Sequence, residues 1–363
     1  MQEHPTSDSN QTEQPKQTTF LPSRPAVEHH FNDDNVNNAH TLSRMDEIEI
    51  LTLNPATSTF TVEPLTSASS PSLASTTAGS SDVPRFYKRC SNLGLSSSTA
   101  SSSSSTLALS SILDVSDLKP AVYEGGFKVW ECAIDLILYL QQQIKLSSTP
   151  SSASSSIFPF GLSNLRVCEL GCGHAFPSLY LIHQGAQHVT MQDYNSEVII
   201  DATIPNAKLN LAPPTIVEGE SSEASSTSMD DSNPSAGSSR LIFPTLSPFI
   251  SSRCRFFSGD WRDSALLSSM GGPRSMDLIL TSDTLYSTEY FVALFDLITS
   301  LLNPSTGCAL IAAKRYYFGI GGSTLEFCEL VQKRGKGEWK TEVVKTIEDG
   351  KSNIREIILL KHK

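Results

Sequence analysis

The stretch Val167–Ala175, V-C-E-L-G-C-G-H-A in one-letter code, constrains the fold of this chain more than any other. It reads as an apolar strand that runs into a glycine turn and opens a helix. Glycines at such a turn adopt positive φ and let the backbone approach a ligand closely. The nicotinamide fingerprint G-x-G-x-x-G is not met, because Phe176 holds the third glycine position. The stretch therefore predicts a ligand-binding turn and disfavours a dehydrogenase.

Strand and helix patterns alternate on both sides of this turn. Expected strands cover residues 166–170, 188–192, 254–258, 276–281 and 308–313, and expected helices cover 129–143, 176–184, 195–211 with a break near Pro205, 288–302 and 324–334. Such alternation predicts a mainly parallel, doubly wound sheet. Two final strand patterns, 339–347 and 354–361, predict a terminal hairpin that adds an antiparallel strand at the edge of the sheet.

Apolar residues are spread unevenly along the chain. Residues 1–110 are rich in Ser, Thr, Asn, Gln and Pro, and this composition buries too little apolar surface to offset the entropy of ordering. We expect this region to be disordered, although the island Met45–Leu53 has the pattern of a short strand or a docking peptide. Residues 111–363 form the expected folded domain. Two serine-rich breaks near 147–156 and 219–239 are predicted to be loop insertions, which cost little entropy.

The composition favours some partners over others. The formal net charge is -11, which disfavours direct nucleic-acid binding and suits a basic protein substrate. No secretory signal is visible, and no apolar run reaches the roughly 18–20 residues of a membrane helix. The seven cysteines include no C-x2-C pair, so we expect reduced thiols and no metal site. These features predict a cytosolic or nuclear monomer that does not bind membranes.

Polar signals follow three further expected strands. Asp193 follows Gly171 by about 20 residues, the position of an acid that accepts hydrogen bonds from ribose hydroxyls; the alternative is a helix cap. Gly259-Asp260-Trp261 offers an acceptor for an adenine amino group and an aromatic face, or else a plain surface turn. The last signal is Thr281–Tyr286. Because ligands bind at the carboxyl ends of such strands, the four signals together predict one site.

The pattern E-x-G-x-G at Glu169–Gly173 resembles the first motif of Rossmann-like methyltransferases, with Ala175 in place of the usual third glycine. Longer motifs resemble the eukaryotic histidine protein methyltransferases over about residues 112–363. They are Asp117–Cys132 with its Y-E-G-G and W-E-C elements, Gln192–Val198, Thr203–Asn206, Gly259–Trp261, Thr281–Tyr286, and Ala313–Gly322 with its Y-F-G-x-G-G element. The D-x-x-Y at Asp283–Tyr286 is shared with related protein-lysine methyltransferases.

The resemblance implies a class I methyltransferase fold with a seven-stranded, mostly parallel sheet and helices on both faces. It implies methyl transfer from S-adenosylmethionine to an imidazole nitrogen of a protein histidine, with a large-subunit ribosomal protein as target, in cytoplasm and nucleus. Glu169 would contact or electrostatically favour the amino-acid end of the cofactor. The residues expected to bind the cofactor are Val129, Trp130, Glu131, Cys132, Ala133, Glu169, Gly171, Gly173, Gln192, Asp193, Tyr194, Asn195, Gly259, Asp260, Trp261 and Ser282.

Methyl transfer to a neutral imidazole requires alignment and the correct tautomer more than a strong base. A carboxylate that accepts the other ring N–H would fix that tautomer, and Asp283 is the first candidate; the alternative is that Asp283 binds only the loop or the cofactor. Tyr286 either lines the substrate channel or packs as a plain aromatic. Trp130 and the run Tyr316–Phe318 are candidates for an aromatic surround. His174 is expected to be a polar residue at the helix start.

Two other functions compete with this hypothesis. A protein-lysine methyltransferase of the same fold fits the D-x-x-Y motif equally well, whereas the Y-E-G-G and Y-F-G-x-G-G elements favour histidine. A non-catalytic module for ribosome assembly needs no cofactor, so it need not keep carboxylates at Glu169, Asp193 and Asp260. Cofactor titration and amino-acid analysis of a methylated product separate the three.

Overall fold

The fold was analysed in a computed structural model that describes residues 24–31, 48–65, 83–89, 118–119, 122–148, 157–158, 161–217, 240–242, 244, 248, 252–350 and 352–363. Most of the first serine-rich break and all of the second, which were predicted to be loop insertions, lie outside these residues. A short pair of strands, β7 (Thr215–Val217) and β8 (Arg240–Ile242), flanks the second break.

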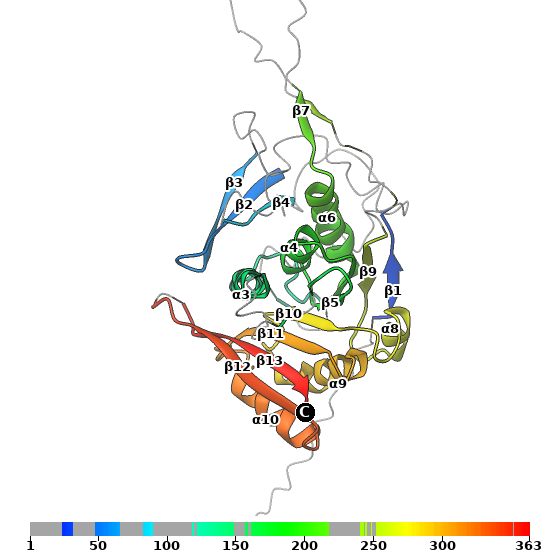
Figure 1. The fold of residues 1–363 in the computed structure, drawn as a ribbon, viewed down its shortest axis with the longest axis vertical. Coiled ribbons are helices and arrows are strands. Elements are labelled where there is room, and N and C mark those ends of the chain that lie inside the picture. The colour runs from blue at the N-terminus through cyan, green and yellow to red at the C-terminus, as the bar shows by residue number, and fades with distance from the viewer. Residues whose placement is uncertain are drawn as a thin grey trace, which may run out of the picture.

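One eight-stranded sheet forms the centre of the molecule (Figure 1). Its strands, in spatial order, are β1 (Val27–His29), β9 (Cys254–Ser258), β6 (His188–Asp193), β5 (Arg166–Leu170), β10 (Leu278–Ser282), β11 (Cys308–Lys314), β13 (Arg355–His362) and β12 (Trp339–Ile347). The run from β9 to β11 is parallel throughout. The chain reverses its direction of growth at β5 and β10, and a reversal of this kind leaves a crevice at the carboxyl ends of the strands.

The terminal hairpin differs from its prediction in one respect. The two strands pair as expected, but β13 lies between β11 and β12 and is antiparallel to both. The antiparallel strand is therefore internal, and β12 forms the edge. The burial of the two strands explains the order, because residues 355–360 of β13 are all buried whereas β12 is mostly exposed or partly exposed.

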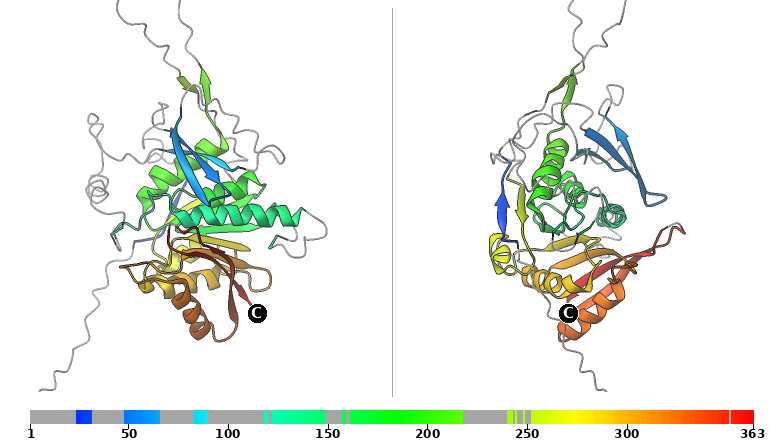
Figure 2. Two further views of the ribbon diagram at one scale, coloured as in Figure 1. Left: turned by 90° about the vertical axis from the view of Figure 1, so that its left-hand side faces the viewer. Right: turned by 180° about the vertical axis from the view of Figure 1, so that it is seen from behind.

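Helices cover both faces of the sheet (Figure 2). On one face, α3 (Glu131–Ser147), α4 (Phe176–His183) and α6 (Ile204–Leu211) pack against side chains such as Val167 and Leu280. On the other face, α8 (Ser264–Ser269), α9 (Phe291–Leu301) and α10 (Thr324–Arg334) pack against Ile279 and Ile311. A one-turn helix, η6 (Thr288–Tyr290), precedes α9. Of the helices in the described part of the chain, none is long and apolar enough to cross a membrane.

The expected break near Pro205 is a π-helical turn. Helix α5 (Ser196–Val198) continues into the π turn η5 (Ile199–Thr203) and then into α6. Proline has no N–H to donate, and here it stands in the first turn of α6, where that loss is tolerated. The wider turn keeps the helical segment continuous beside the sheet.

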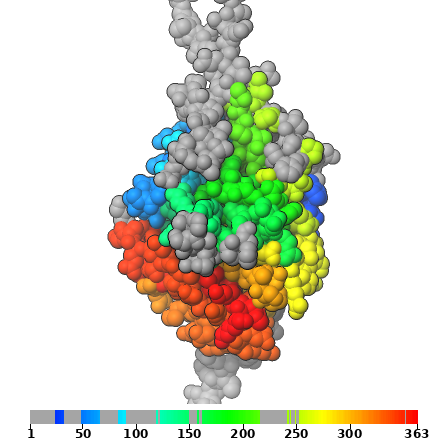
Figure 3. Space-filling model, viewed as in Figure 1, coloured from blue at the N-terminus to red at the C-terminus, as the bar shows by residue number. Residues whose placement is uncertain are grey.

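The expectation that residues 1–110 are disordered is wrong for the parts that the structure describes. Strand β1 extends the central sheet, and β2 (Ile48–Asn54), β3 (Thr59–Pro64) and β4 (Arg85–Arg89) form a second, antiparallel sheet. Strand β1 and the second sheet lie on opposite sides of the molecule (Figure 3). The second sheet is held on α6 by two asparagines: Asn210 exchanges hydrogen bonds with the backbone of Tyr87, and Asn206 accepts one from the N–H of Arg89. The contacts that hold β1 on β9 and β4 on α6 come from residues more than 100 positions away in sequence.

Candidate active site

A cavity of about 830 Å³, counted with its open mouth, lies at the carboxyl ends of β5, β6, β9 and β10. It brings together ten of the residues predicted from the sequence for cofactor binding: Val129, Trp130, Ala133, Gly171, Gly173, Asp193, Tyr194, Asp260, Trp261 and Ser282. The two candidate catalytic residues, Asp283 and Tyr286, line it as well. The predicted convergence of signals at the strand ends is thus present in the fold.

The glycine turn after β5 has the predicted backbone conformation. Gly171 and Gly173 have φ of 64° and 50°, in the left-handed region. A Cβ on Gly171 would lie 2.7 Å from Thr284 Cγ2, so the neighbouring strand end leaves no room for a side chain there. Ala175, in place of the family's third glycine, is also left-handed with φ of 59° and serves as the N-cap of α4. The small departure from the motif is therefore accommodated at some cost in backbone strain.

Glu169, predicted to contact or electrostatically favour the cofactor, does not line the cavity. Its carboxyl is buried behind the turn, outside the cavity lining, and accepts a hydrogen bond from the N–H of Ser178 in the first turn of α4 at 3.0 Å. Ala175 has no side-chain acceptor, so Glu169 supplies the cap that this helix otherwise lacks. Burial raises the pKa of Glu169 to about 8. It supports the site from below the turn and does not line it.

Asp193 is buried at the end of β6 and lines the cavity. Its Oδ2 accepts the N–H of Gly173 at 2.9 Å, and its Oδ1 accepts the N–H of Asn195 at 3.2 Å. Burial raises its pKa to about 6, while these backbone hydrogen bonds act in the opposite direction. The helix-cap position belongs to Asn195, so the alternative reading of Asp193 as the cap is wrong. The carboxylate of Asp193 is therefore held in place by the glycine turn after β5 and by the backbone at the start of α5.

The turn after β9 places Asp260 and Trp261 on the cavity wall. Asp260 is paired with Arg262, whose Nη2 lies 2.5 Å from Oδ2, so the acid already has a cationic partner. Trp261 donates its indole N–H to Oε1 of Gln192 at 2.8 Å, which orients the ring. Gln192 is fully buried behind this contact and does not line the cavity. Gly259 does not line it either, because residues Pro25 and Ala26 pass over it.

The segment before α3 forms another wall. Trp130 donates its indole N–H to the carbonyl of Gly125 at 2.9 Å, and Lys128 Nζ lies 4.7 Å from the centre of the ring. Two neighbours predicted for cofactor binding point elsewhere: Glu131 pairs with Lys314 at 3.3 Å, and the side chain of Cys132 is fully buried in the core. Only the residues on one side of this first helical turn therefore reach the cavity.

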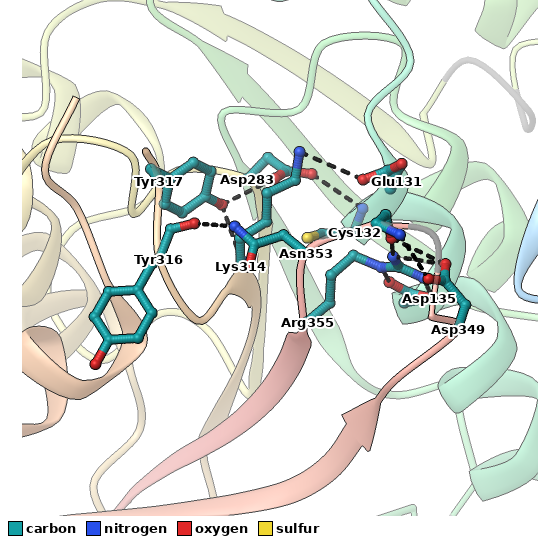
Figure 4. A network of polar contacts seen from close by, with 11 residues as sticks. Glu131, Cys132, Asp135, Asp283, Lys314, Tyr316, Tyr317, Asp349, Asn353 and Arg355 are labelled. Carbon is teal, nitrogen blue, oxygen red and sulfur yellow. Dashed lines mark hydrogen bonds and ion pairs between the residues drawn. The ribbon is translucent and has the colours of Figure 1, made fainter. Parts of the chain in front are cut away.

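Asp283 joins three elements of the site (Figure 4). Its Oδ2 accepts the N–H of Cys132 in the first turn of α3 at 3.0 Å, and its Oδ1 accepts the hydroxyl hydrogen of Tyr317 at 2.8 Å. The residue is buried, and its φ of 54° is rare for a non-glycine residue. Burial raises its pKa, and Lys314 opposes this effect. Asp283 thus ties the start of α3 to the segment of Tyr317, which favours the alternative in which Asp283 binds the loop.

Tyr286 belongs to a cluster that the sequence did not predict. Its hydroxyl donates to Oε2 of Glu124, and the hydroxyl of Tyr290 donates to Oε1 of the same carboxylate at 3.0 Å. All three residues line the cavity. Burial and the neighbouring carboxylate raise the pKa of Tyr286, so its phenol stays protonated at neutral pH. The Y-E-G-G motif contained the signal, because a glutamate before two glycines has no evident structural role.

Other predicted residues are placed as follows. Tyr316 and Phe318 are 47% and 85% exposed, and neither lines the cavity, so they form no aromatic surround. Asn195 accepts the N–H of Glu124 through Oδ1 and donates to the carbonyl of Val122, which positions the wall rather than lining it. His174 is buried between the carbonyl of Phe127 and the side chain of Asn206, and burial lowers its pKa to about 4. His174 also lines the cavity, and as a neutral ring bonded at the start of α4 it agrees with the expected polar residue at the helix start.

The sheet order, the glycine turn and the acid at the end of the second core strand define a class I, S-adenosylmethionine-dependent methyltransferase fold. Its residues suit an adenosyl group, since a buried carboxylate lies near an oriented indole in the same cavity. Within the described part of the chain, no group of His, Cys, Asp and Glu residues is arranged to hold a metal ion.

No family model matches the chain. Curated relatives do: a histidine protein methyltransferase 1 homologue of Dictyostelium discoideum is 35% identical over 252 residues, covering 69% of this chain and 62% of that protein. The homologue of Bos taurus is 34% identical, and the match covers 62% of this chain and 53% of that protein. Histidine protein methyltransferase 1 of Schizosaccharomyces pombe is 33% identical, and the match covers 60% of this chain and 59% of that protein. The chain is thus similar to histidine protein methyltransferase 1 and its homologues over 60% to 69% of its own length, in agreement with the resemblance of its motifs. It spans between 53% and 62% of the length of these three relatives.

Proposed function

We propose that this chain transfers a methyl group from S-adenosylmethionine to an imidazole nitrogen of a protein histidine. The observation that supports this most directly is the cavity at the strand ends, where Asp193, Trp261 and Tyr286 come together in a chain that is similar to histidine protein methyltransferase 1 homologues. When bound, the sulfonium cofactor supplies an activated methyl group. The chain's own residues then have to bind, orient and exclude water.

Asp193 is the residue that we assign to the ribose hydroxyls. Its carboxylate is fixed by the peptide N–H groups of Gly173 and Asn195, and each oxygen retains a lone pair for a further donor. Trp261 and Trp130, each oriented by an indole hydrogen bond, offer aromatic faces to the base and to the positively charged centre. Asp260 contributes with Arg262 as an ion pair rather than as a free acid.

On the substrate side, we assign Tyr286 the contact with the imidazole. Its hydroxyl hydrogen is donated to Glu124, so the phenol oxygen is left as an acceptor for the N–H of a histidine ring. An acceptor at that place selects the tautomer whose other nitrogen carries the lone pair. Asp283 acts as a positioning residue, because it holds the start of α3 and Tyr317.

A large-subunit ribosomal protein is the substrate that we propose, with the reaction taking place in cytoplasm and nucleus. The net charge of -11 supports a basic protein partner. It also supports a monomer that binds neither nucleic acid nor membranes directly.

The test is an assay with radiolabelled S-adenosylmethionine, the purified chain and large-subunit ribosomal proteins, followed by hydrolysis and identification of the labelled amino acid. Methylhistidine that is absent with the Asp193→Ala variant is the expected result. Methyllysine would assign the chain to the competing activity. Cofactor binding without label on any of these proteins would overturn the proposed substrate, and absence of both would leave a non-catalytic module.

A further inference from the structure

The N-terminal segment of residues 24–29, which we call the strap, begins beside Asp260, and its strand β1 forms the edge of the central sheet (Figure 1). Its strand β1 pairs antiparallel with β9, from Val27 opposite Ser258 to His29 opposite Phe256. The strap lies more than 90 residues before the first wall of the cavity in sequence. Sequence patterns assigned it to a disordered tail, so its place beside the site needs an explanation.

The backbone of the strap holds the turn that carries Asp260. The carbonyl of Arg24 accepts the N–H of Asp260 at 3.1 Å, and the N–H of Ala26 donates to Oδ2 of Asp263 at 3.0 Å. Asp263 uses its other oxygen to cap α8, where it accepts the N–H of Ala265. The strap therefore fixes both ends of the short segment that presents Asp260 and Trp261 to the cavity.

The side chain of Arg24 reaches the neighbouring wall. Its Nη1 donates to Oε2 of Glu197 at 2.9 Å, and its Nη2 donates to the carbonyl of Val122 at 3.2 Å. The guanidinium carbon lies 5.4 Å from the centre of the Tyr194 ring, within range of a cation–π contact. Arginine suits this place because its planar fork serves two acceptors while its face stacks on an aromatic ring. One residue thus links the Val122 segment, Tyr194 and the Asp260 turn.

Gly259 gives an independent indication that the strap belongs to the site. A Cβ on Gly259 would lie 3.0 Å from the Cα of Ala26, and the residue has φ of 147°, where side chains are strained. The glycine of the G-D-W motif, which was predicted to line the cofactor site, is thus explained by the close passage of the strap. The absence of a side chain at Gly259 is therefore what allows the backbone at Ala26 to pass so close to the turn.

From these contacts we infer that Arg24 is a positioning residue of the cofactor site and that the strap is an integral part of that site. Asn195 already bonds the Tyr194 segment to the Val122 segment, and Gly259 bonds to Asp193. Arg24 adds a contact that spans all three segments at the outer edge of the site. A cofactor held between an acid and aromatic faces binds best when those groups are already in place, because ordering them on binding would cost free energy. This inference rests on the proposed cofactor binding, and not on the identity of the protein substrate.

The test measures the dissociation constant of S-adenosylmethionine for the full chain by isothermal titration calorimetry. Arg24→Ala should weaken binding roughly tenfold, because an ion pair and a cation–π contact are lost from the cavity wall. Arg24→Lys should recover part of the affinity, since the charge beside Glu197 is kept. The matched control is Arg255→Ala, which removes the ion pair of Arg255 with Glu28 at 3.0 Å on the same edge of the sheet and should change the affinity less than twofold.

Thermal unfolding of each variant without cofactor shows whether the fold is intact, and Arg24→Lys carries the test if Arg24→Ala does not fold. Equal affinities for the wild-type chain and the Arg24 variants would overturn the inference. Equal losses for Arg24→Ala and Arg255→Ala would overturn it too, because the effect would then belong to the sheet edge in general. A wild-type chain that binds no S-adenosylmethionine would overturn the proposed function as well, so the two failures are distinguishable.

Discussion

Arg355 and Asp135 form an ion pair that is closed off from solvent: Nε of Arg355 lies 2.6 Å from Oδ2 of Asp135, and their side chains are 2% and 1% exposed. The pair joins β13 to α3, the helix whose first turn is held by Asp283 (Figure 4). Asp349, in the β12–β13 turn, is a second carboxylate partner of Arg355 at 3.1 Å. The internal position of β13 is what brings this arginine beneath the wall of the active site.

Arg355→Met should lower the free energy of unfolding by about 3–5 kcal/mol, because it leaves Asp135 buried without its cationic partner. Burial already raises the pKa of Asp135 to about 6 despite the arginine. The double variant Asp135→Leu/Arg355→Met should lose much less of the free energy of unfolding, since no isolated buried charge remains. Urea unfolding of the single and double variants is the measurement, and equal losses would show that packing, not charge, is at stake.

Glu169→Gln should make the free energy of unfolding less sensitive to a rise in pH from acid values to about 8. Burial raises the pKa of Glu169 to about 8 in the folded chain, above the ordinary value for glutamate. The stability that the neutral carboxyl contributes is therefore present at acid pH and is lost as the pH rises toward 8. Glutamine keeps an acceptor for Ser178 and does not titrate. The free energy of unfolding of the variant should therefore rise relative to that of the wild-type chain by roughly 1.4 kcal/mol per pH unit across that window.

Unfolding free energies of the wild-type chain and Glu169→Gln between pH 5 and pH 8 check this expectation. Taking the difference between the two chains cancels the titration of other groups, including His174, whose lowered pKa acts in the opposite direction. A constant difference over the whole range would contradict the assignment of the raised pKa to Glu169.

Cofactor affinity should increase as the pH rises through about 6, the pKa of the buried Asp193. Only the ionised carboxylate has its full capacity to accept hydrogen bonds from ribose hydroxyls. Asp193→Asn should weaken binding by about ten- to hundredfold at pH 7.5, the range expected for a hydrogen bond to a charged group. The variant should also lose the pH dependence. Calorimetric titrations with S-adenosylmethionine at pH 5.5 and 7.5 test both points, and an unchanged slope in the variant would assign the titration to another group.

Tyr286→Phe should lower kcat by roughly ten- to hundredfold through loss of the contact that fixes the substrate tautomer. The affinity for S-adenosylmethionine should change little, since the aromatic ring is kept. Tyr316→Phe is the control, because Tyr316 is 47% exposed and lies outside the cavity lining. The measurement is the initial rate of histidine methylation at saturating cofactor. Equal rates for Tyr286→Phe and the wild-type chain would remove Tyr286 from the reaction.

The sequence by itself determined the alternation of the core and the place of its ligand-binding turn. Strands such as Arg166–Leu170 and Cys254–Ser258, and the helix Thr324–Arg334, have the bounds that their patterns predicted. Gly171, Asp193 and Asp260 were found because each follows a strand directly, and parallel strands end at one edge of a sheet. Signals of this kind are local, so a single chain segment contains all the information that they need.

Only the tertiary structure decided which distant residues meet. It placed β13 between β11 and β12, because a strand buried on both faces gains more as an internal strand than at the edge. It turned Glu169 away from the cavity, joined Glu124 to Tyr286, and set Arg24 beside Tyr194. A short strand such as Val27–His29 has too weak a pattern to be recognised alone, since its stability comes from β9, more than 220 residues further along the chain.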